Sequence, residues 1–205
     1  MHEVFENMEV KFDATSDICE DVYSLLLKEN FNIVANHVKR VGKKSRELAR
    51  KFKYDEQIAE IASYLHDISV IIPNSEKIQI CELLNIEVLE EEKAFPLLIH
   101  QKLSRKMAED IYGVENEDVL SAINCHTTLK RDSKTLDLIL FVADKIEWDQ
   151  QGIPPYLETV EKGLEKSLED GAYAYVEYII RNKKNLKVVH PWLVEAYEDL
   201  KNKLG

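Results

Sequence analysis

Helix-breaking residues are scarce in this chain, and long hydrophobic runs are missing from it. Glycine and proline account for only 6 and 5 of the 205 residues, which favours helices over a turn-rich β architecture. No stretch reaches about 18 consecutive apolar residues, the length that a transmembrane helix needs. The first residues, Met1 to Glu6, lack the basic segment and the apolar run of a signal peptide. We therefore expect a soluble, cytoplasmic protein without a membrane partner.

Basic residues are outnumbered by acidic ones. Lys and Arg number 27 against 38 for Asp and Glu, and the formal net charge is -11. Non-specific binding to nucleic acid or to an anionic membrane requires a basic face that releases counterions. The charge balance therefore argues against both partners. It remains compatible with a small phosphorylated ligand, because a bound cation can reverse the local field.

Cysteine is rare as well. Cys19, Cys81 and Cys125 have no CxxC spacing, which indicates reduced thiols rather than a disulfide framework. Cys125 adjoins His126, so a nucleophilic Cys/His pair is one alternative. The interpretation that we favour is a small core residue.

Apolar residues recur at three- and four-residue spacing along most of the chain, as they do in amphipathic helices. The pattern predicts an all-α fold of roughly nine or more helices, the first of them capped by Thr15 or Ser16. The expected helices cover about residues 13–30, 32–52, 56–72, 75–84, 86–93, 95–111, 117–126, 133–146, 157–168, 172–180 and 191–200.

Four of the six histidines fall among core positions of separate predicted helices. His66 and Asp67 adjoin in one of them, and His37, His100 and His126 lie in three others. A buried carboxylate is costly without a partner. Any one of these histidines alone is most simply a satisfied core residue, but together the positions predict a metal site.

A fifth predicted helix contributes another carboxylate. Asp144 lies in the strongly apolar segment Leu136 to Ile146, and Asp137 is the more exposed alternative there. His2, near the start of the chain, and His190, before a proline, are left out of the predicted site.

The predicted ligands mix imidazole and carboxylate. This set suits iron, manganese, cobalt or zinc better than calcium, and the lack of cysteine ligands argues against a structural zinc site. A metal ion held in this way can lower the pKa of a bound water and neutralise phosphoryl oxygens as they gain charge. The residues by themselves therefore predict a metal ion that can activate water and neutralise phosphoryl oxygens.

Several short segments carry these residues in order along the chain. They are NHVKRV (Asn36–Val41), YLHDI (Tyr64–Ile68), PLLIH (Pro96–His100), AINCHTT (Ala122–Thr128) and FVADKIE (Phe141–Glu147). Their order, H…HD…H…H…D, resembles that of the HD-domain metal-dependent phosphohydrolases. The fuller wording resembles the YqeK group, the bacterial symmetrical diadenosine tetraphosphate hydrolases. The resemblance covers about residues 37–156, and the chain departs from the usual pattern at Ser69, Gln101 and Leu129.

The resemblance implies a fold, a cofactor and a reaction. The fold would be a single HD-type helical domain over residues 1–205, with a metal-site core at about 31–156 and C-terminal helices over 157–203 packed on it. The cofactor would be a divalent transition metal, with iron first and manganese, cobalt or zinc as alternatives. The reaction would be hydrolysis of diadenosine tetraphosphate at its centre to two ADP by a metal-activated water. Another nucleotide substrate, or a non-catalytic sensor that binds nucleotide or metal, stays open, and so does a homodimer.

The resemblance also implies roles for individual residues. His37, His66, Asp67 and Asp144 would hold the metal. Asp67, His100 and His126 would be catalytic, with His100 or His126 acting on the departing phosphate. The substrate would contact His37, His100, His126 and Thr127.

Overall fold

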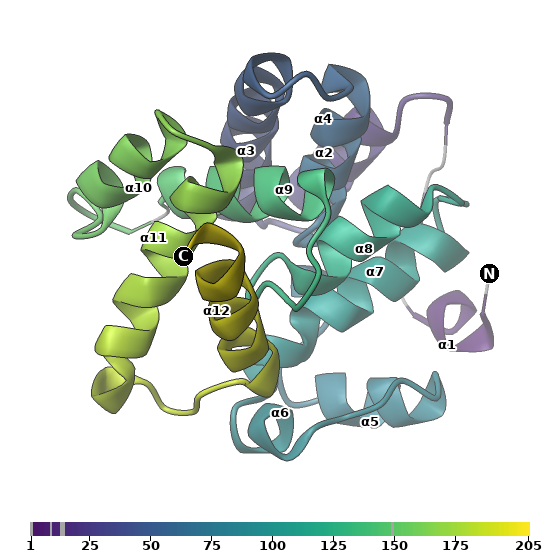
Figure 1. The fold of residues 1–205 in the computed structure, drawn as a ribbon. Helices are drawn as coiled ribbons and strands as arrows, with labels where there is room; N and C mark the ends of the chain where they lie inside the picture. Colours follow the sequence, from purple (N-terminus) through teal and green to yellow (C-terminus); the bar gives the residue numbers. More distant parts are fainter. Residues whose placement is uncertain (1, 9, 13–14, 149) are drawn as a thin grey trace.

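The computed structural model describes residues 2–8, 10–12, 15–148 and 150–205, and over these ranges it contains helices and turns but no strand. The predicted all-α fold class is therefore confirmed (Figure 1). Within this part of the chain, no helix is long and apolar enough to cross a membrane. The α-helices are α1 (Glu3–Glu6), α2 (Ile18–Lys28), α3 (Asn32–Lys51), α4 (Glu56–Leu65), α5 (Lys77–Leu83), α6 (Glu90–Ala94), α7 (His100–Asp110), α8 (Glu117–Cys125), α9 (Thr135–Ile146), α10 (Leu157–Leu164), α11 (Leu168–Arg181) and α12 (Pro191–Leu204). Three 3₁₀ helices join them, η1 (Ile68–Ile71), η2 (Pro96–Ile99) and η3 (Lys183–Asn185).

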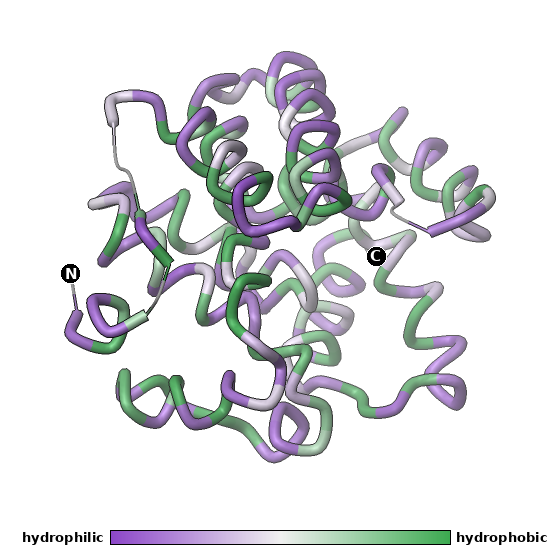
Figure 2. The backbone as a smooth tube through the Cα atoms, turned by 180° about the vertical axis from the view of Figure 1, so that it is seen from behind, coloured by the Kyte–Doolittle hydropathy of each residue, from purple (hydrophilic) through white to green (hydrophobic). Residues whose placement is uncertain are grey.

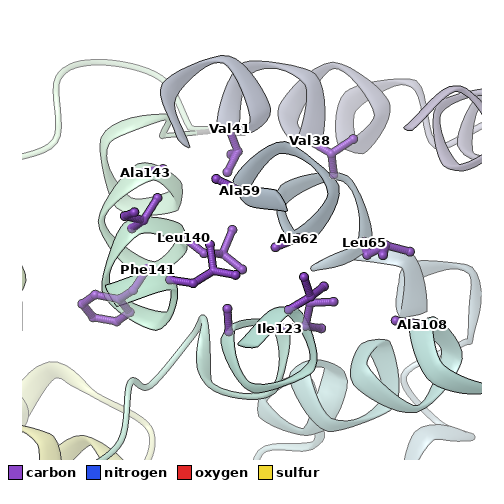
Figure 3. Packing of buried hydrophobic residues seen from close by; sticks show 14 of the residues in the cluster. Val38, Val41, Ala59, Ala62, Leu65, Ala108, Ile123, Leu140, Phe141 and Ala143 are labelled. Carbon is purple, nitrogen blue, oxygen red and sulfur yellow. The ribbon is translucent and has the colours of Figure 1, made fainter. Parts of the chain in front are cut away.

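Helix α9 lies at the centre of the molecule and packs against α3, α8 and α11 (Figure 1). Every residue from Leu136 to Ala143 is buried, as expected of a helix that is apolar all round. The close-up in Figure 3 shows Leu140 of α9 facing Val41 of α3, Ala59 of α4 and Ile123 of α8. On the outer helices, hydrophobic and hydrophilic stretches alternate along the backbone (Figure 2). The helices that will supply the candidate site are thus fixed by packing on one shared core.

Side-chain caps decide where several helices begin. The predicted cap at Thr15 or Ser16 is wrong, because Asp17 Oδ1 accepts the Glu20 amide and α2 begins at Ile18. Thr15 instead donates its hydroxyl to Asp21. An aspartate satisfies a free amide of the first turn at least as well as a hydroxyl does.

The helix predicted to run through His66 and Asp67 to the proline at position 73 is shorter than expected. Helix α4 ends at Leu65, and the chain continues as the 3₁₀ helix η1, with the Val70 amide bonded to the Asp67 carbonyl. The helix predicted over 95–111 is likewise divided into η2 and α7, with the boundary at His100. Helical periodicity does not distinguish the two helix types over so few residues. Both breaks fall at candidate ligands.

The helix predicted over 86–93 is also wrong in its extent. Helix α6 begins only at Glu90, because the Glu92 carboxylate accepts the Leu89 amide and so caps the helix at that point. Residues 86–89 are not helical.

The C-terminal helices α11 and α12 pack on each other, and α11 also packs on α9. The division of residues 1–205 into one domain stays a prediction.

Candidate metal centre

The candidate ligands come from five helices that meet at one point. His37 lies in the middle of α3, and Asp144 lies near the end of α9. His66 follows the last residue of α4, His126 follows the last residue of α8, and His100 opens α7 after η2. Three histidines thus lie at helix ends, where the backbone leaves carbonyl groups without a helical partner.

Those three histidines use the same local contact. Nδ1 of His66 lies 2.6 Å from the carbonyl of Ser63, three residues earlier, and Nδ1 of His126 lies 2.8 Å from that of Ile123. Nδ1 of His100 lies 2.6 Å from the carbonyl of the residue three positions before it. A carbonyl only accepts hydrogen bonds, so each Nδ1 carries the proton. The Nε2 atom of each ring is therefore directed toward the centre and keeps its lone pair in the neutral form, as second-shell hydrogen bonds arrange in metal sites.

A first group of potential ligands consists of His37, His66 and Asp67, whose ligand atoms lie within 4.8 Å of one another. His66 Nε2 is 3.4 Å from Asp67 Oδ2 and 3.6 Å from Asp144 Oδ1. His37 Nε2 is 3.0 Å from Asp144 Oδ1. His66 Nε2 is fully buried yet makes no hydrogen bond, which is unusual for a buried nitrogen. A cation between these atoms would satisfy it, so the residues present fit a metal ion.

A second group consists of Asp67, His100 and His126. The Nε2 atoms of the two histidines face each other at 2.9 Å. Both Nδ1 protons are donated to carbonyls. If both rings were neutral, the lone pairs of the two Nε2 atoms would face and repel each other, so the contact requires a shared proton or a cation between them. Asp67 Oδ1 lies 3.3 Å from His100 Nε2 and 3.6 Å from His126 Nε2. Asp67 thus turns Oδ2 toward the first group and Oδ1 toward the second.

Burial and the two carboxylates together set the charges at the centre. Burial alone would lower the pKa of His66, but Asp67 and Asp144 raise it to about 10. The pKa of Asp67 is held well below its usual range despite burial, chiefly by the charge of His66. Burial lowers the pKa of His126 to about 4. The centre thus holds two carboxylates beside the His66 imidazolium, whose Nε2 proton a divalent cation could replace.

Lys145 is the cation next to this centre. Its ammonium group donates to Asp144 Oδ2 at 2.6 Å and lies over the rings of Phe141 and Tyr175. Burial would lower the pKa of Lys145, but the adjacent Asp144 raises it. The sequence places Lys145 directly after a candidate ligand, but it does not show that this side chain turns back to that carboxylate.

A cavity of about 410 Å³ opens onto the metal centre. Its lining combines the candidate ligands with aromatic side chains from the end of α9 to α11: His37, Asp67, His100, His126, Thr127, Asp144, Lys145, Trp148, Gln150, Pro155, Tyr156, Tyr175, Tyr178 and Ile179. Tyr156 makes ring contacts with Trp148, Tyr175 and Tyr178. Two of the tyrosines that periodicity predicts as packing residues, Tyr175 and Tyr178, therefore also face the cavity.

Two sequence departures lie beside the centre and shape its turns. Gln101 is buried, and its Oε1 accepts the Thr127 amide at 3.1 Å. Leu129 is buried with a φ of 58°, and its amide bonds to the Cys125 carbonyl at 2.7 Å. Together they hold the turn that carries His126 and Thr127.

Two alternatives from the sequence lie away from the centre. Asp137 is not the more exposed of the two carboxylates in its helix, because it is fully buried and accepts hydrogen bonds from Ser121 and the Lys134 amide. Asp144 keeps 14% of its side chain exposed at the cavity. Burial raises the pKa of the Cys125 thiol well above its usual value, which is unfavourable for a nucleophile.

Known proteins give a consistent match to this arrangement. A model of the HD domain family matches residues 34–149. An uncharacterised protein in the pepC 5′ region of Lactococcus lactis subsp. cremoris is 46% identical over 147 residues, which cover 72% of this chain and 74% of that protein. The symmetrical bis(5′-nucleosyl)-tetraphosphatase of Bacillus subtilis (strain 168) is 29% identical over 160 residues, covering 73% of this chain and 83% of the relative.

A solved structure shares the fold. It is that of a predicted HD superfamily hydrolase involved in NAD metabolism from Clostridium acetobutylicum, with a TM-score of 0.82 and 24% sequence identity, covering 93% of this chain and 100% of that one. The family model spans more than half of the sequence and includes every candidate ligand from His37 to Asp144. The resemblance predicted from the motifs is thus confirmed, and the chain belongs to the HD domain family.

Proposed function

We propose that this HD-domain phosphohydrolase cleaves diadenosine tetraphosphate symmetrically to two ADP. The observation that carries the proposal is the division of the Asp67 carboxylate between two groups of imidazoles at the end of a cavity. Relatives named as symmetrical tetraphosphatases support the choice of substrate.

His37, His66, Asp67 and Asp144 would hold a divalent transition metal, with iron as the first candidate. When bound, such an ion would neutralise phosphoryl oxygens and lower the pKa of a water molecule. The donor set of imidazoles and carboxylates supports a metal of this class. If a second ion binds, Asp67, His100 and His126 would hold it.

The protein's own groups would orient the substrate and move the protons. Asp67 would orient the attacking water. His100, with 16% of its side chain exposed, lies at the rim, while His126 is 1% exposed. We therefore assign protonation of the departing phosphate to His100, and positioning of that ring to His126. Thr127 Oγ1 lies 3.2 Å from His100 Nε2, so its hydroxyl can contact the same phosphate.

The aromatic wall of the cavity would bind one nucleoside. Tyr175 and Tyr178 of α11, with Trp148, offer rings on which a base can stack, a contact worth about 1–3 kcal/mol. Trp148 Nε1 is buried without a hydrogen-bond partner, so it has a free donor for a base or a ribose. Lys145 supplies positive charge between this wall and the metal centre.

Metal analysis combined with product chromatography tests the proposal. The purified protein, supplied with iron(II) under reducing conditions, should convert diadenosine tetraphosphate to ADP alone. Asp67→Asn and His66→Gln should each lower metal content and reduce turnover by more than about a hundredfold, beyond the usual effect of a second-shell change. Asp199→Asn, which alters a largely buried carboxylate on α12, is the matched control and should change neither.

Other products would contradict the proposal in distinct ways. Formation of AMP and ATP would exclude symmetrical cleavage. Metal binding without any product would favour the sensor alternative. Metal content that survives both substitutions would show that the site assignment is wrong.

A further inference from the structure

A second cavity, of about 560 Å³, meets the metal centre from a different set of segments. It shares only Asp67 and His100 with the first cavity. Its remaining lining comes from the start of α3, from η1 and the residues after it, from the start of α5, and from η2: Phe31, Val34, Val70, Ile71, Ile72, Pro73, Asn74, Lys77 and Leu97. The candidate catalytic residues Asp67 and His100 therefore border both cavities.

The second cavity differs from the first in its chemistry. Its walls are mainly aliphatic, and among the described lining residues Asp67 is the only carboxylate. Lys77 is the only lysine or arginine there, and Asn74 adds an exposed amide. In a protein with a formal net charge of -11, a cavity with so little negative charge is suited to an anionic ligand that also has an apolar part.

The buried ammonium group of Lys77 would be stabilised by such an anion. Only 2% of the residue is exposed, and its ammonium donates to the Ser69 carbonyl at 3.1 Å. Ser69 Oγ in turn donates to the His100 carbonyl at 2.9 Å, which connects Lys77 to the backbone at the centre. A buried ammonium has three donors and is costly unless it is paired with negative charge. The nearby Asp67 is already directed toward four imidazoles.

Building on the proposed function, we propose that the second cavity holds the second nucleoside-phosphate arm of a two-armed substrate, and that Lys77 contacts the phosphates of that arm. Symmetrical cleavage of a dinucleoside tetraphosphate breaks a bond of the central bridging oxygen, so one nucleoside-diphosphate arm lies on each side of that oxygen. Asp67 and His100 border both cavities, and each cavity adds apolar side chains and one lysine, Lys145 in the first and Lys77 in the second. This arrangement would place one arm in each cavity.

Two substitutions of different kinds test this subsite. Lys77→Met removes the charge and keeps the length of the side chain. Val34→Trp places bulk in the second cavity without changing Lys77 or a proposed ligand. The matched control is Ile33→Trp, because Ile33 is the neighbouring residue of α3, is 74% exposed and does not line the cavity.

Binding would be measured by calorimetry on the metal-loaded protein with two probes. One is a diadenosine tetraphosphate analogue with a methylene group in place of the central bridging oxygen, and the other is ADP. Loss of one charge-assisted contact weakens binding about tenfold to a hundredfold. Both variants should lose this much affinity for the analogue and change the affinity for the first-bound ADP less than threefold, while Ile33→Trp binds both as the wild type does.

The outcomes separate this inference from the proposed function. The inference is overturned if the wild type does not bind the analogue, or if both variants bind it as tightly as the wild type. It is also overturned if the variants lose affinity for the analogue and for ADP equally. The proposed function fails instead if the wild type releases no ADP from diadenosine tetraphosphate. A selective loss of affinity for the analogue would support the second subsite even in that case.

Discussion

Metal binding should release a proton from His66, and its affinity should therefore depend on pH. Asp67 and Asp144 raise the pKa of this imidazole to about 10 in the metal-free protein. Nδ1 is already committed to the Ser63 carbonyl, so the proton that is lost must come from Nε2, the proposed ligand atom. A metal ion at this position has to displace that proton.

The size of the effect follows from the pKa. At pH 7 the group lies three pH units below its pKa of about 10, and one unit corresponds to about 1.4 kcal/mol. Proton displacement at His66 therefore costs about 4 kcal/mol at pH 7, and the apparent affinity should rise about tenfold for each pH unit between 6 and 8. The pKa of Asp67 and that of Asp144 are lowered, so neither carboxylate adds a proton.

Titration calorimetry with manganese(II) in buffers of different ionisation enthalpy would measure both the affinity and the proton release. His2→Gln, which changes a histidine outside the proposed site, should keep the slope of the wild type. Nitrogen chemical shifts of the metal-free protein should show both His66 nitrogens protonated at pH 7. An affinity that is flat between pH 6 and 8 would refute the reasoning, since it would mean that no protonated ligand is displaced.

The same shift has a consequence for the metal-free protein's stability. The pKa of His66 is raised above the ordinary value of 6.5 for an imidazole, so its contribution to the free energy of unfolding is fully present below about pH 6.5 and is lost as the pH rises toward 10. Added metal should therefore increase the melting temperature more at pH 8 than at pH 6.

Three further predictions concern other parts of the molecule. Tyr178→Leu should raise KM for diadenosine tetraphosphate about tenfold or more with little change in kcat, since stacking is lost; an unchanged KM would exclude this ring from the nucleoside site. Glu92→Gln should lower the free energy of unfolding by about 3 kcal/mol in urea at pH 7, because the buried Lys102, 2.8 Å away, loses its partner. In thermal unfolding, Leu129→Gly should have a free energy of unfolding about 1 kcal/mol higher than Leu129→Ala, because φ is 58° and alanine is strained there. An alanine variant more stable than the glycine variant would contradict this prediction.

The stabilisation from the buried pair of Glu92 and Lys102 should be lost in acid. Burial would raise the pKa of Glu92, but hydrogen bonds from His190, the Leu89 amide and Lys102 lower it. The stabilisation is therefore present above the unfolded pKa of about 4.5 and is lost as the pH falls through the lowered value in the folded protein.

The all-α class could be predicted from the sequence, and so could the candidate site residues His37, His66, Asp67, His100, His126 and Asp144. Both followed from local physics. Apolar periodicity and scarce glycine and proline predict helices, and an imidazole or carboxylate among core positions requires a partner. The motifs also predicted the HD family correctly.

How these residues lie relative to one another depends on the packing of the helices and could not be predicted from the sequence. Periodicity could not show that α4 stops at Leu65, or that His66 and His126 use free carbonyls at helix ends to direct Nε2 inward. Neither cavity could be predicted, because the residues that line each cavity come from segments far apart in the chain. Lys77 lies beside the centre only because α5 packs against η2 and α7. Contacts between distant segments depend on how whole helices pack, and the spacing of residues within one helix does not specify that packing.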